Sequence, residues 1–373
     1  MWLVLAAALL AQARPTLSLA ATAEQLPPWL PRNPACPTNG CPLPAPRTAG
    51  TVDTTQYLHP GNTAAQNTAG WKSLVKVLEA NPGSVAAIPG GFYDVEPLWA
   101  ASGLVNVTIV GGQDTRTVFH VHNAKGEHVA AWTSCRGLYL RDLDFVAVGV
   151  PPCTPTECET TSGLNWYNVS DSIVEGVSMA GGRMMSMSGG CPCSSCTCHN
   201  PPINFHFRRC YSSNAPVGIF LCDSWYSSIV DSVAENVTGS PGYGIEIKSA
   251  AIGNWITDST ARSCKYGFAH GSMNGFVDRS WASNLSAVDC RTAIVTSGSN
   301  CAWEGVHVQG ASTTAAAVEC MVNRVGSGKN NSFEIFVDRC VRKQPYRKIF
   351  SCDSIHSTMK NEQLPRQAQE NIT

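Results

Sequence analysis

The chain has 373 residues, of which 43% are hydrophobic and 14% are charged. A chain this long and apolar can bury a full core, which excludes a disordered protein. Its 26 basic and 27 acidic side chains nearly cancel, so no long-range field would draw it to nucleic acid or to an anionic membrane, and a nucleic-acid partner is not expected.

An apolar run begins the chain. Residues 2–11 are all Trp, Val, Leu or Ala, and the run is shorter than the roughly 20 residues that span a bilayer. Small-x-small sites follow it and end at Ala13 and Ala23, so we predict a signal peptide over residues 1–23 and a secreted, extracellular protein. The alternative is a buried N-terminal helix. No later run reaches spanning length, so no membrane span is expected.

Two further features fit export. Asn-x-Ser/Thr sequons, which accept N-linked glycans, begin at Asn106, Asn168, Asn236, Asn284, Asn330 and Asn371. The chain also has 17 cysteines, which in an exported protein predict disulfides rather than metal ligands. Because the number is odd, at least one thiol is free or pairs with another chain.

A proline-rich segment over residues 24–50 favours extended backbone and is predicted to be a leader or linker, in which Cys36 and Cys41 close a small loop. The segment 67–81 follows it and has apolar residues at helical spacing, with Asn-Pro-Gly as a stop signal. The apolar residues are Trp71, Leu74, Val75 and Leu78. One short amphipathic helix is therefore predicted.

After Gly83 the sequence consists of short runs of Val, Ile, Phe and Thr, each closed by Gly, Asn, Ser or Asp. One strand type recurs as Ser172-Ile-Val-Glu, Ser228-Ile-Val-Asp, Trp255-Ile-Thr-Asp and Phe276-Val-Asp-Arg. A second type aligns Ile219, Ile245, Phe268, Ile294 and Val318, which are 26, 23, 26 and 24 residues apart. This period predicts a solenoid whose turns stack about 4.8 Å apart.

Three features are similar to one known family: the helix over 68–80, the segment Gly83–Val95 with its Pro-Gly turn, and these rungs. The sequence resembles the right-handed parallel β-helix of the pectate-lyase-like (pectin lyase fold) superfamily. The resemblance extends from residue 55 to about residue 342. The resemblance implies an all-β, single-stranded parallel β-helix solenoid with a short N-terminal capping helix. The expected divisions are 1–23 signal peptide, 24–50 linker, 51–345 β-helix and 346–373 C-terminal tail. Because the superfamily includes lyases, hydrolases, epimerases, esterases and non-catalytic members, no single activity follows.

Several motifs of active members are absent. The chain lacks the Asn-Thr-Asp, Asp-Asp and Gly-His-Gly set of the polygalacturonase branch. Tyr266-Gly-Phe-Ala-His270 resembles part of the mannuronan epimerase motif, but Ala269 stands where that motif has Asp-Pro, so we attribute the match to chance. Neither a phosphate-binding glycine loop nor a nucleophile elbow occurs, and the scattered Ser, His and Asp residues define no triad.

The second strand type resembles the sheet that floors the substrate groove in this fold. Since side chains alternate along a strand, Glu246 and Lys248 point to solvent if Ile245 and Ile247 lie inside. The same parity exposes Phe220, Ala269, Val295 and Glu319. Three rungs separate Glu246 from Glu319, about 14 Å, which is too far for the paired carboxylates of a glycosidase.

A lyase needs a base and a cation, such as Ca²⁺, that acidifies the proton beside a uronate carboxyl. The predicted catalytic residues are Glu246, Lys248 and His270, the predicted substrate-binding residues are Arg291, Tyr243, Tyr266 and Glu319, and Ca²⁺ is the candidate cofactor. Alternatives remain open: Glu246 and Lys248 as a solvated pair, His270 as a buried, hydrogen-bonded histidine, and the tyrosines as a stacked column.

Cysteines cluster in one loop. Cys191, Cys193, Cys196 and Cys198 lie within nine residues that end at His199. In a reducing compartment they would suggest a metal site, but in an exported protein they predict cross-links. Cys264 and Cys290 each precede the aligned apolar residue by four, so they are predicted to sit one rung apart at a disulfide-compatible separation. A reduced cysteine column is the alternative.

Two functions are therefore carried forward. In the first, a secreted β-helix binds an acidic extracellular polysaccharide and cleaves or modifies it by β-elimination. In the second, a non-catalytic β-helix serves in adhesion or as a cell-wall or matrix protein. Glu246, Lys248 and Arg291 favour the first function, and the missing motifs favour the second.

Overall fold

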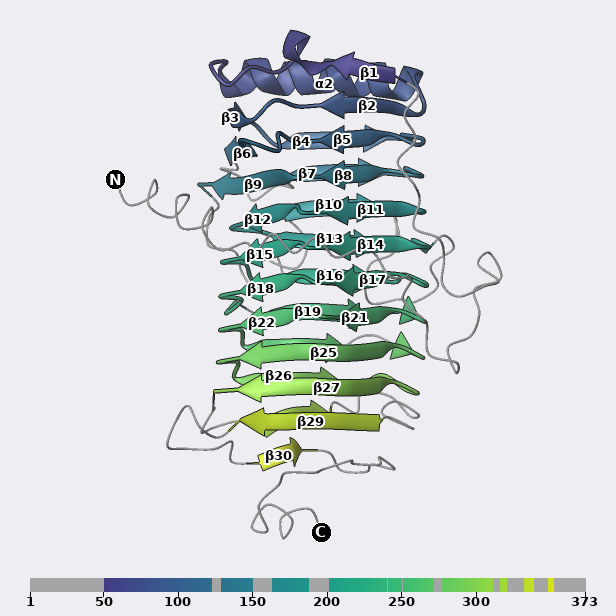
Figure 1. Cartoon of the computed structure of the whole chain (residues 1–373), viewed down its shortest axis with the longest axis vertical. Coiled ribbons are helices and arrows are strands. Elements are labelled where there is room, and N and C mark those ends of the chain that lie inside the picture. The colour runs from purple at the N-terminus through teal and green to yellow at the C-terminus, as the bar shows by residue number, and fades with distance from the viewer. Residues whose placement is uncertain are drawn as a thin grey trace. The chain divides into compact units, whose positions relative to one another are not determined.

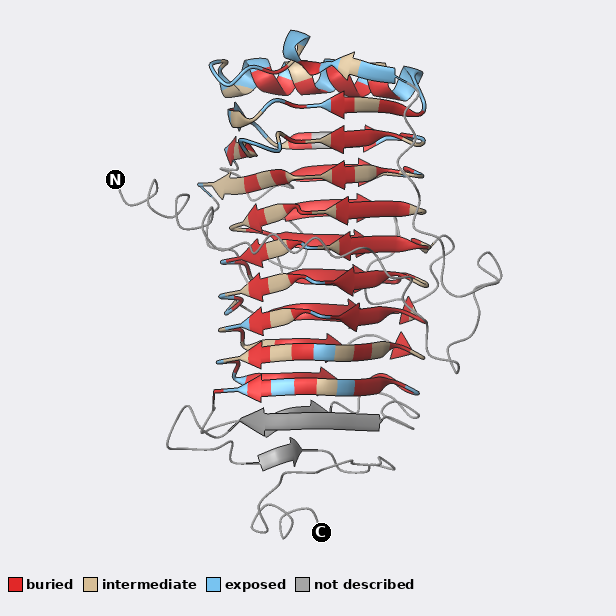
Figure 2. Cartoon of the chain, in the orientation of Figure 1, coloured by how far each residue is buried: buried red, intermediate tan, exposed pale blue. Residues whose placement is uncertain are grey.

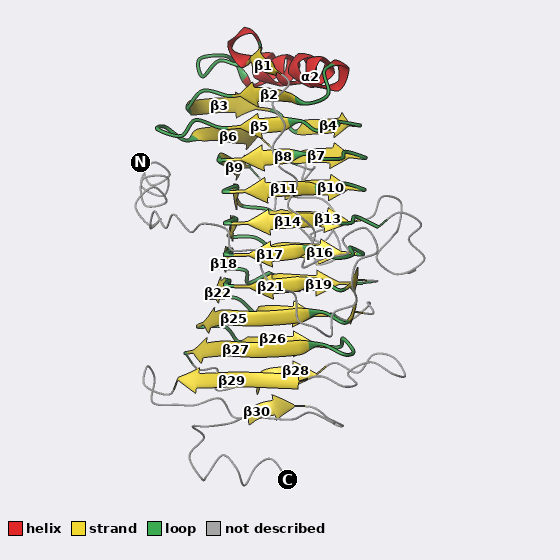
Figure 3. Ribbon diagram, turned by 45° about the vertical axis from the view of Figure 1, so that its right-hand side comes forward, coloured by secondary structure: helices red, strands yellow, loops and turns green. Residues whose placement is uncertain are grey.

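The computed structural model describes residues 50–122, 129–149, 163–187, 201–239, 241–249, 251–271, 277–310, 316–320, 332–338 and 348–351. The chain divides into the units 1–42 and 43–373, and every described residue belongs to the second. The predicted signal peptide, Cys36 and Cys41 lie outside the described residues. Figure 1 shows the described strands stacked one above another, and Figure 3 shows the same stack turned by 45°.

Within the described residues, the larger sheet, called sheet A, has 18 parallel strands. They are β1 (Gly50–Asp53), β2 (Ser84–Ala87), β3 (Gly91–Val95), β5 (Thr108–Val110), β6 (Thr117–His122), β8 (Tyr139–Arg141), β9 (Leu143–Val148), β11 (Ser172–Glu175), β12 (Ser178–Ala180), β14 (Phe205–Arg208), β15 (Tyr211–Ser213), β17 (Ser228–Val230), β18 (Val233–Glu235), β21 (Trp255–Thr257), β22 (Thr260–Arg262), β25 (Trp281–Val288), β27 (Ala302–Gln309) and β29 (Ser332–Asp338).

The second sheet, sheet B, has 10 parallel strands in the part of the chain that the structure describes. They are β4 (Leu98–Ser102), β7 (Ala130–Thr133), β10 (Gly163–Tyr167), β13 (Arg183–Met187), β16 (Ile219–Cys222), β19 (Tyr243–Lys248), β23 (Tyr266–His270), β26 (Thr292–Thr296), β28 (Ala316–Cys320) and β30 (Lys348–Ser351). A third sheet pairs β20 (Ala251–Ile252) with β24 (Val277–Asp278). Because β30 pairs with β28, sheet B extends beyond the predicted end of the β-helix at residue 345.

The predicted helix is confirmed as α2 (Ala64–Ala80), which follows the 3-10 turn η1 (Thr54–Gln56). Thr63 caps α2, and its side chain exchanges hydrogen bonds with Gln66 in a capping box. The four predicted apolar residues are buried, and Trp71 packs edge-on against Phe119 of β6 at 6.0 Å. The helix therefore covers the first rung, which would otherwise present unpaired strand edges.

The register of sheet B is the one that the repeat predicts. Ile219 pairs with Ile245, which pairs with Phe268, and the ladder continues through Ile294 to Val318. In sheet A the alignment of Ser228 with Trp255 is confirmed. The other two alignments are wrong, because Ile173 rather than Ser172 shares a ladder with Ser228 through His206, and Trp281 rather than Phe276 pairs with Trp255.

Sheet A turns a corner at a single residue with positive φ, which follows a strand or, in β25, lies within it. The corner residues are Asp142, Gly176, Arg209, Asp231, Asp258 and Asn284, with φ from 47 to 61°. Asn, Asp and Gly adopt this left-handed conformation most readily, which explains why short polar residues recur there. Asn106, Asn168 and Asn236 also have φ near 55°, so four of the sequon asparagines have a backbone role as well. Their glycosylation stays a prediction.

Buried residues recur from rung to rung along the stack (Figure 2). The aromatic and aliphatic side chains among them form one continuous core. Phe119 stacks on Phe145 at 5.2 Å, and Trp132 lies almost parallel to Trp166 at 5.0 Å. Each rung is too small to bury its own apolar residues, so the neighbouring rungs complete the core.

Candidate functional site

The outward side chains of β10, β13, β16, β19, β23 and β26 form one surface, here called the B face. Ile245 and Ile247 belong to the central core, so Glu246 and Lys248 lie on the outer side, as predicted. Their exposure to solvent is nevertheless wrong: Glu246 is 1% exposed and Lys248 is 6% exposed. Alternation along a strand determines the side of the sheet, whereas burial depends on what lies over that side.

The other positions of the same parity are buried too, contrary to expectation. Phe220, Ala269 and Val295 belong to a second apolar cluster, separate from the core. The register confirms that Glu246 and Glu319 lie three rungs apart, since Glu246 pairs with Ala269, Ala269 with Val295 and Val295 with Glu319. A pair of glycosidase carboxylates on this ladder stays excluded.

Three charged side chains are embedded in this apolar face: Arg183, Glu246 and Lys248. Arg183 donates from Nη2 to Asn165 Oδ1 at 3.2 Å, and its guanidinium lies 5.7 Å from the ring centre of Phe220. Lys248 pairs in register with Cys222. Since burying a charge is costly unless other groups compensate it, an apolar face with a few charged groups has the composition of a ligand site.

His270 does not join these residues. It pairs with Ile247 and Thr296, so its ring lies on the core side of sheet B. The ring packs 4.1 Å from that of Trp303, and neither ring nitrogen has a hydrogen-bond partner among the described residues. Burial lowers the pKa of His270 to about 3. His270 is therefore a buried core histidine, and the expected convergence with Glu246 and Lys248 does not occur.

The predicted tyrosines do come together. Tyr243 stacks on Tyr266 at 4.9 Å, so the stacked column is confirmed. The Lys265 ammonium lies 5.1 Å from the ring centre of Tyr266. Arg291 is exposed and directly precedes Thr292, which pairs with Tyr266. These four residues, Tyr243, Lys265, Tyr266 and Arg291, are called the tyrosine edge.

The two cations of the tyrosine edge, Lys265 and Arg291, differ in their ion pairing from most other described arginines. Within the described residues, neither Lys265 nor Arg291 forms an ion pair with a carboxylate. Ion pairs do hold Arg116, Arg136, Arg141, Arg209, Arg262 and Arg279. The tyrosine edge thus presents two cations that no described carboxylate pairs with, one of them over the ring of Tyr266.

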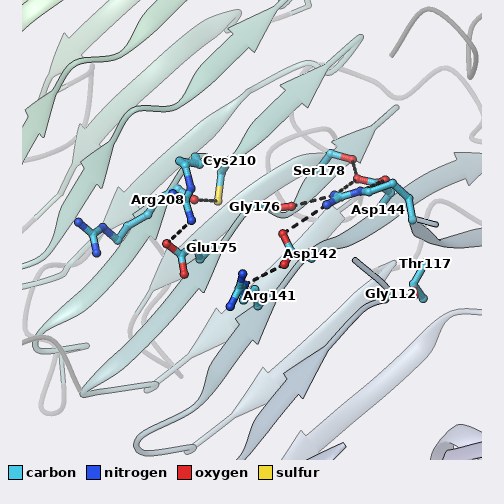
Figure 4. Close-up of polar contacts among 12 residues, drawn as sticks. Gly112, Thr117, Arg141, Asp142, Asp144, Glu175, Gly176, Ser178, Arg208 and Cys210 are labelled. Carbon is cyan, nitrogen blue, oxygen red and sulfur yellow. Dashed lines mark hydrogen bonds and ion pairs between the residues drawn. The ribbon is translucent and has the colours of Figure 1, made fainter. Parts of the chain in front are cut away.

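A polar ladder on sheet A was not predicted. Arg116 binds both carboxylate oxygens of Asp144, at 2.6 and 2.8 Å, and reaches Asp142 at 3.4 Å. Arg141 pairs with the other oxygen of Asp142 at 2.8 Å, and Ser178 donates to Asp144 (Figure 4). These side chains come from three rungs and meet at the corner, which the sequence spacing alone does not reveal.

The same ladder repeats one arrangement, in which a tyrosine donates to a glutamate that also pairs with an arginine. Tyr139 donates to Glu175, whose carboxylate lies 2.6 Å from Arg209. In the second copy, Tyr211 donates to Glu235 at 2.7 Å, and Arg262 lies 3.7 Å from that carboxylate. Burial and the hydrogen bond to Glu235 raise the pKa of Tyr211 to about 12, so this phenol acts as a donor rather than as a base.

The cysteines with described side chains, which are Cys135, Cys210, Cys222, Cys264, Cys290 and Cys301, are buried, and no disulfide joins any two of them. Cys264 and Cys290 lie one rung apart as predicted, and the hydrogen bond between their thiols lowers the pKa of Cys264 and raises that of Cys290. The structure thus contains the reduced alternative, and the disulfide stays a prediction.

The loop with Cys191, Cys193, Cys196 and Cys198 lies outside the described residues. Among the residues that are described, no group of three or more His, Cys, Asp or Glu side chains is arranged to hold a metal ion. No helix in the described ranges is long and apolar enough to cross a membrane.

No protein-family model matches the chain, and no curated protein matches it. Solved structures do match. An alginate lyase from Paenibacillus sp. str. FPU-7 has 12% identity and a TM-score of 0.50, with 78% of this chain and 97% of that chain covered. The endo-xylogalacturonan hydrolase from Aspergillus tubingensis has 11% identity and a TM-score of 0.55, with 81% and 90% covered.

The enzymatically active domain of bacteriophage CBA120 tailspike protein 2 has 11% identity and a TM-score of 0.53, with 84% of this chain and 47% of that chain covered. These three structures share the right-handed parallel β-helix, and the chain described here has that fold. At such low identity the likeness extends to the fold alone, so the function has to be argued from the residues.

Proposed function

We propose that this protein is secreted, binds an acidic polysaccharide at the tyrosine edge and acts on it by β-elimination at the neighbouring B face. The observation that carries the proposal is a pair of cations on neighbouring rungs: Lys265 lies over the ring of Tyr266, Arg291 precedes the residue that pairs with Tyr266, and neither cation pairs with a described carboxylate. An aromatic face suits the C–H face of a sugar, and the cations suit uronate carboxylates.

The spacing of the rungs supports a polymeric ligand. Lys265 precedes β23, and Arg291 precedes β26, which is the next strand of sheet B. Adjacent strands lie about 4.8 Å apart, so neighbouring acidic groups of one polymer can contact both cations. The arginines of the polar ladder are poorer candidates, because intramolecular carboxylates already occupy them.

The elimination step is assigned to Lys248, which ends the strand that Tyr243 begins. A neutral Lys248 amine would remove the proton beside the uronate carboxyl, the β C–O bond would break, and an unsaturated uronate would result. Glu246, on the same side of β19, would orient the lysine. Ca²⁺ would stabilise the carboxylate charge that develops. Because no group of three His, Cys, Asp or Glu side chains among the described residues is arranged to hold it, the substrate carboxylates would supply most of its ligands.

A second candidate is a non-catalytic adhesion or matrix protein that uses the same tyrosine edge. The burial of Lys248, which is 6% exposed, favours it, because a base that acts on a polysaccharide has to be accessible to a polymer chain. The position of His270 in the core favours it too.

One experiment separates the two. The purified protein is titrated with alginate, pectate and a glycosaminoglycan, with neutral dextran as control, while binding and the absorbance of unsaturated uronate are followed. Lys265→Ala and Arg291→Ala should each weaken binding about tenfold, and added salt should weaken it further. Arg136→Ala is the matched control, since Arg136 is exposed but paired with Asp171.

If the protein acts by elimination, the wild type should form unsaturated uronate. The product should be absent in Lys248→Met and when a chelator is added. Binding without product, unchanged in Lys248→Met, supports the non-catalytic candidate. If none of the three polyanions binds more tightly than dextran, both candidates are rejected.

A further inference from the structure

A chain of hydrogen bonds runs through the outward side chains of sheet A, away from the tyrosine edge. At its centre, His206 of β14 contacts Ser228 Oγ through Nδ1 at 2.8 Å and Asn204 Oδ1 through Nε2 at 2.6 Å. His206 and Ser228 are each 2% exposed, and Asn204 is 6% exposed. The register creates the contact, since His206 pairs directly with Ser228 of β17.

The chain continues to a charged end that determines its direction. Asn204 Nδ2 donates to Asp171 Oδ1 at 3.0 Å, and Arg136 Nε donates to Asp171 Oδ2 at 2.9 Å. An ionised carboxylate only accepts hydrogen bonds, so the amide of Asn204 must turn its NH₂ group toward Asp171 and its oxygen toward His206.

That orientation fixes the histidine tautomer. Because Asn204 Oδ1 is an acceptor, Nε2 of His206 must carry the proton, and Nδ1 is left with a lone pair. The Ser228 hydroxyl therefore donates to Nδ1. Burial, with a smaller contribution from Arg208, lowers the pKa of His206 to about 3, so the ring is neutral at neutral pH and its Nδ1 lone pair faces the Ser228 hydroxyl.

We propose that Ser228, His206 and Asn204 form a nucleophilic triad that hydrolyses small-acyl carboxylic esters, a second activity independent of polysaccharide binding. Their geometry has the three required roles: a hydroxyl, a base in hydrogen-bond contact with it, and a group that holds the base in one tautomer. Trp255 pairs with Ser228, and its ring lies 5.7 Å from that of His206. Such close packing around the hydroxyl selects a small acyl group such as acetyl.

Water is the only reactant that the hydrolysis needs besides the ester. Ser228 Oγ bonds to the ester carbonyl carbon while its proton passes to His206 Nδ1. The C–O bond to the alcohol then breaks, and the alcohol leaves with that proton. Water attacks the acyl-serine with His206 again as base, which releases the carboxylic acid and restores Ser228.

The test uses the intact protein in two assays. In the first, an alkyl fluorophosphonate, which reacts with activated serines, is added and the adduct is located by intact-mass and peptide analysis. In the second, hydrolysis of the ester p-nitrophenyl acetate is measured. One adduct on Ser228 is expected, and Ser228→Ala should abolish both the adduct and turnover. His206→Gln should slow turnover at least about 100-fold. Ser178→Ala is the matched control, since Ser178 donates to a carboxylate instead of a histidine, and should keep full labelling.

Asn204 is a positioning residue, so its test needs a readout of its own. Asn204→Leu releases the ring to the other tautomer, which should lower kcat for p-nitrophenyl acetate while KM is unchanged. The proposal is overturned if the wild-type protein, with a native circular dichroism spectrum, gains no adduct at Ser228, or if its ester hydrolysis equals that of Ser228→Ala.

Discussion

The outward ladders of the two sheets occupy equivalent positions in the register but have opposite surroundings. On sheet B, the ladder through Phe220, Glu246 and Ala269 is buried and mostly apolar. On sheet A, the ladder beyond the corner through Ser178 and Tyr211 is half-buried and belongs to the network of ion pairs. The comparison shows that strand alternation assigns a side chain to the inside or the outside of the solenoid. It does not decide whether an outward side chain is exposed to solvent.

The largest expected effect comes from a charge on the buried ladder. Ala269→Lys should lower the free energy of unfolding by about 3 kcal/mol or more, because Ala269 is 0% exposed and an unpaired charge would be buried there. Thr260→Lys on the half-buried ladder of sheet A should change it by less than about 0.5 kcal/mol. Urea denaturation measures both variants, and equal costs would contradict the difference between the two ladders.

Removing a buried charge should rank next. Arg183→Ala takes away a hydrogen bond to Asn165 and packing on Phe220, so the free energy of unfolding should fall by about 3 kcal/mol. Arg136→Ala, at a side chain that is 76% exposed, should cost less than about 1 kcal/mol. A cost for Arg183→Ala as small as that for Arg136→Ala would mean that Arg183 is solvated in solution.

Much of the fold can be predicted from the sequence because a solenoid repeats its local pattern. The small-then-apolar pattern gave the ladder from Ile219 to Val318 without error. The Ser-Ile-Val pattern misaligned Ser172 by one residue, because a strand whose two faces are both apolar does not distinguish its own registers. The displacement of Phe276 has a similar origin: Val277 resembles a rung residue but belongs to β24.

The candidate sites are less predictable, since they depend on contacts between rungs. The side of Glu246 follows from alternation, whereas its burial depends on contacts outside its own strand. His206 and Ser228 are 22 residues apart, and nothing in that separation shows that they are directly opposed. The register between rungs, which depends on the variable length of the corners, brings the Ser228 hydroxyl, the His206 ring and the Asn204 amide into hydrogen-bond contact.

Acid should destabilise the protein through its buried histidines. Burial lowers the pKa of His206 and of His270 to about 3, from 6.5 in the unfolded chain. Between these values only the unfolded chain binds the proton, so stability is full above about pH 6.5 and is lost as the pH falls, by about 1.4 kcal/mol per pH unit for each histidine.

His270→Phe separates the two contributions. It should halve the loss of stability per pH unit that the two buried histidines cause together. At pH 7 it should raise the free energy of unfolding by about 1 kcal/mol, since two buried ring nitrogens without hydrogen bonds are removed. Urea denaturation at several pH values is the measurement. An unchanged pH slope would show that His270 is already protonated, and therefore solvated, in the folded protein.

The smallest effect is expected on the exposed side of the comparison. Arg262, whose side chain is 50% exposed, lies 3.7 Å from Glu235, so Arg262→Ala should cost no more than about 1 kcal/mol. Because water and salt screen such a pair, the cost should shrink further at high ionic strength, whereas that of Arg183→Ala should not. Glu235 keeps its hydrogen bond from Tyr211 in this variant, so no buried group loses its last partner. A cost that persists in high salt would mean that the polar ladder is as shielded from water as the B face.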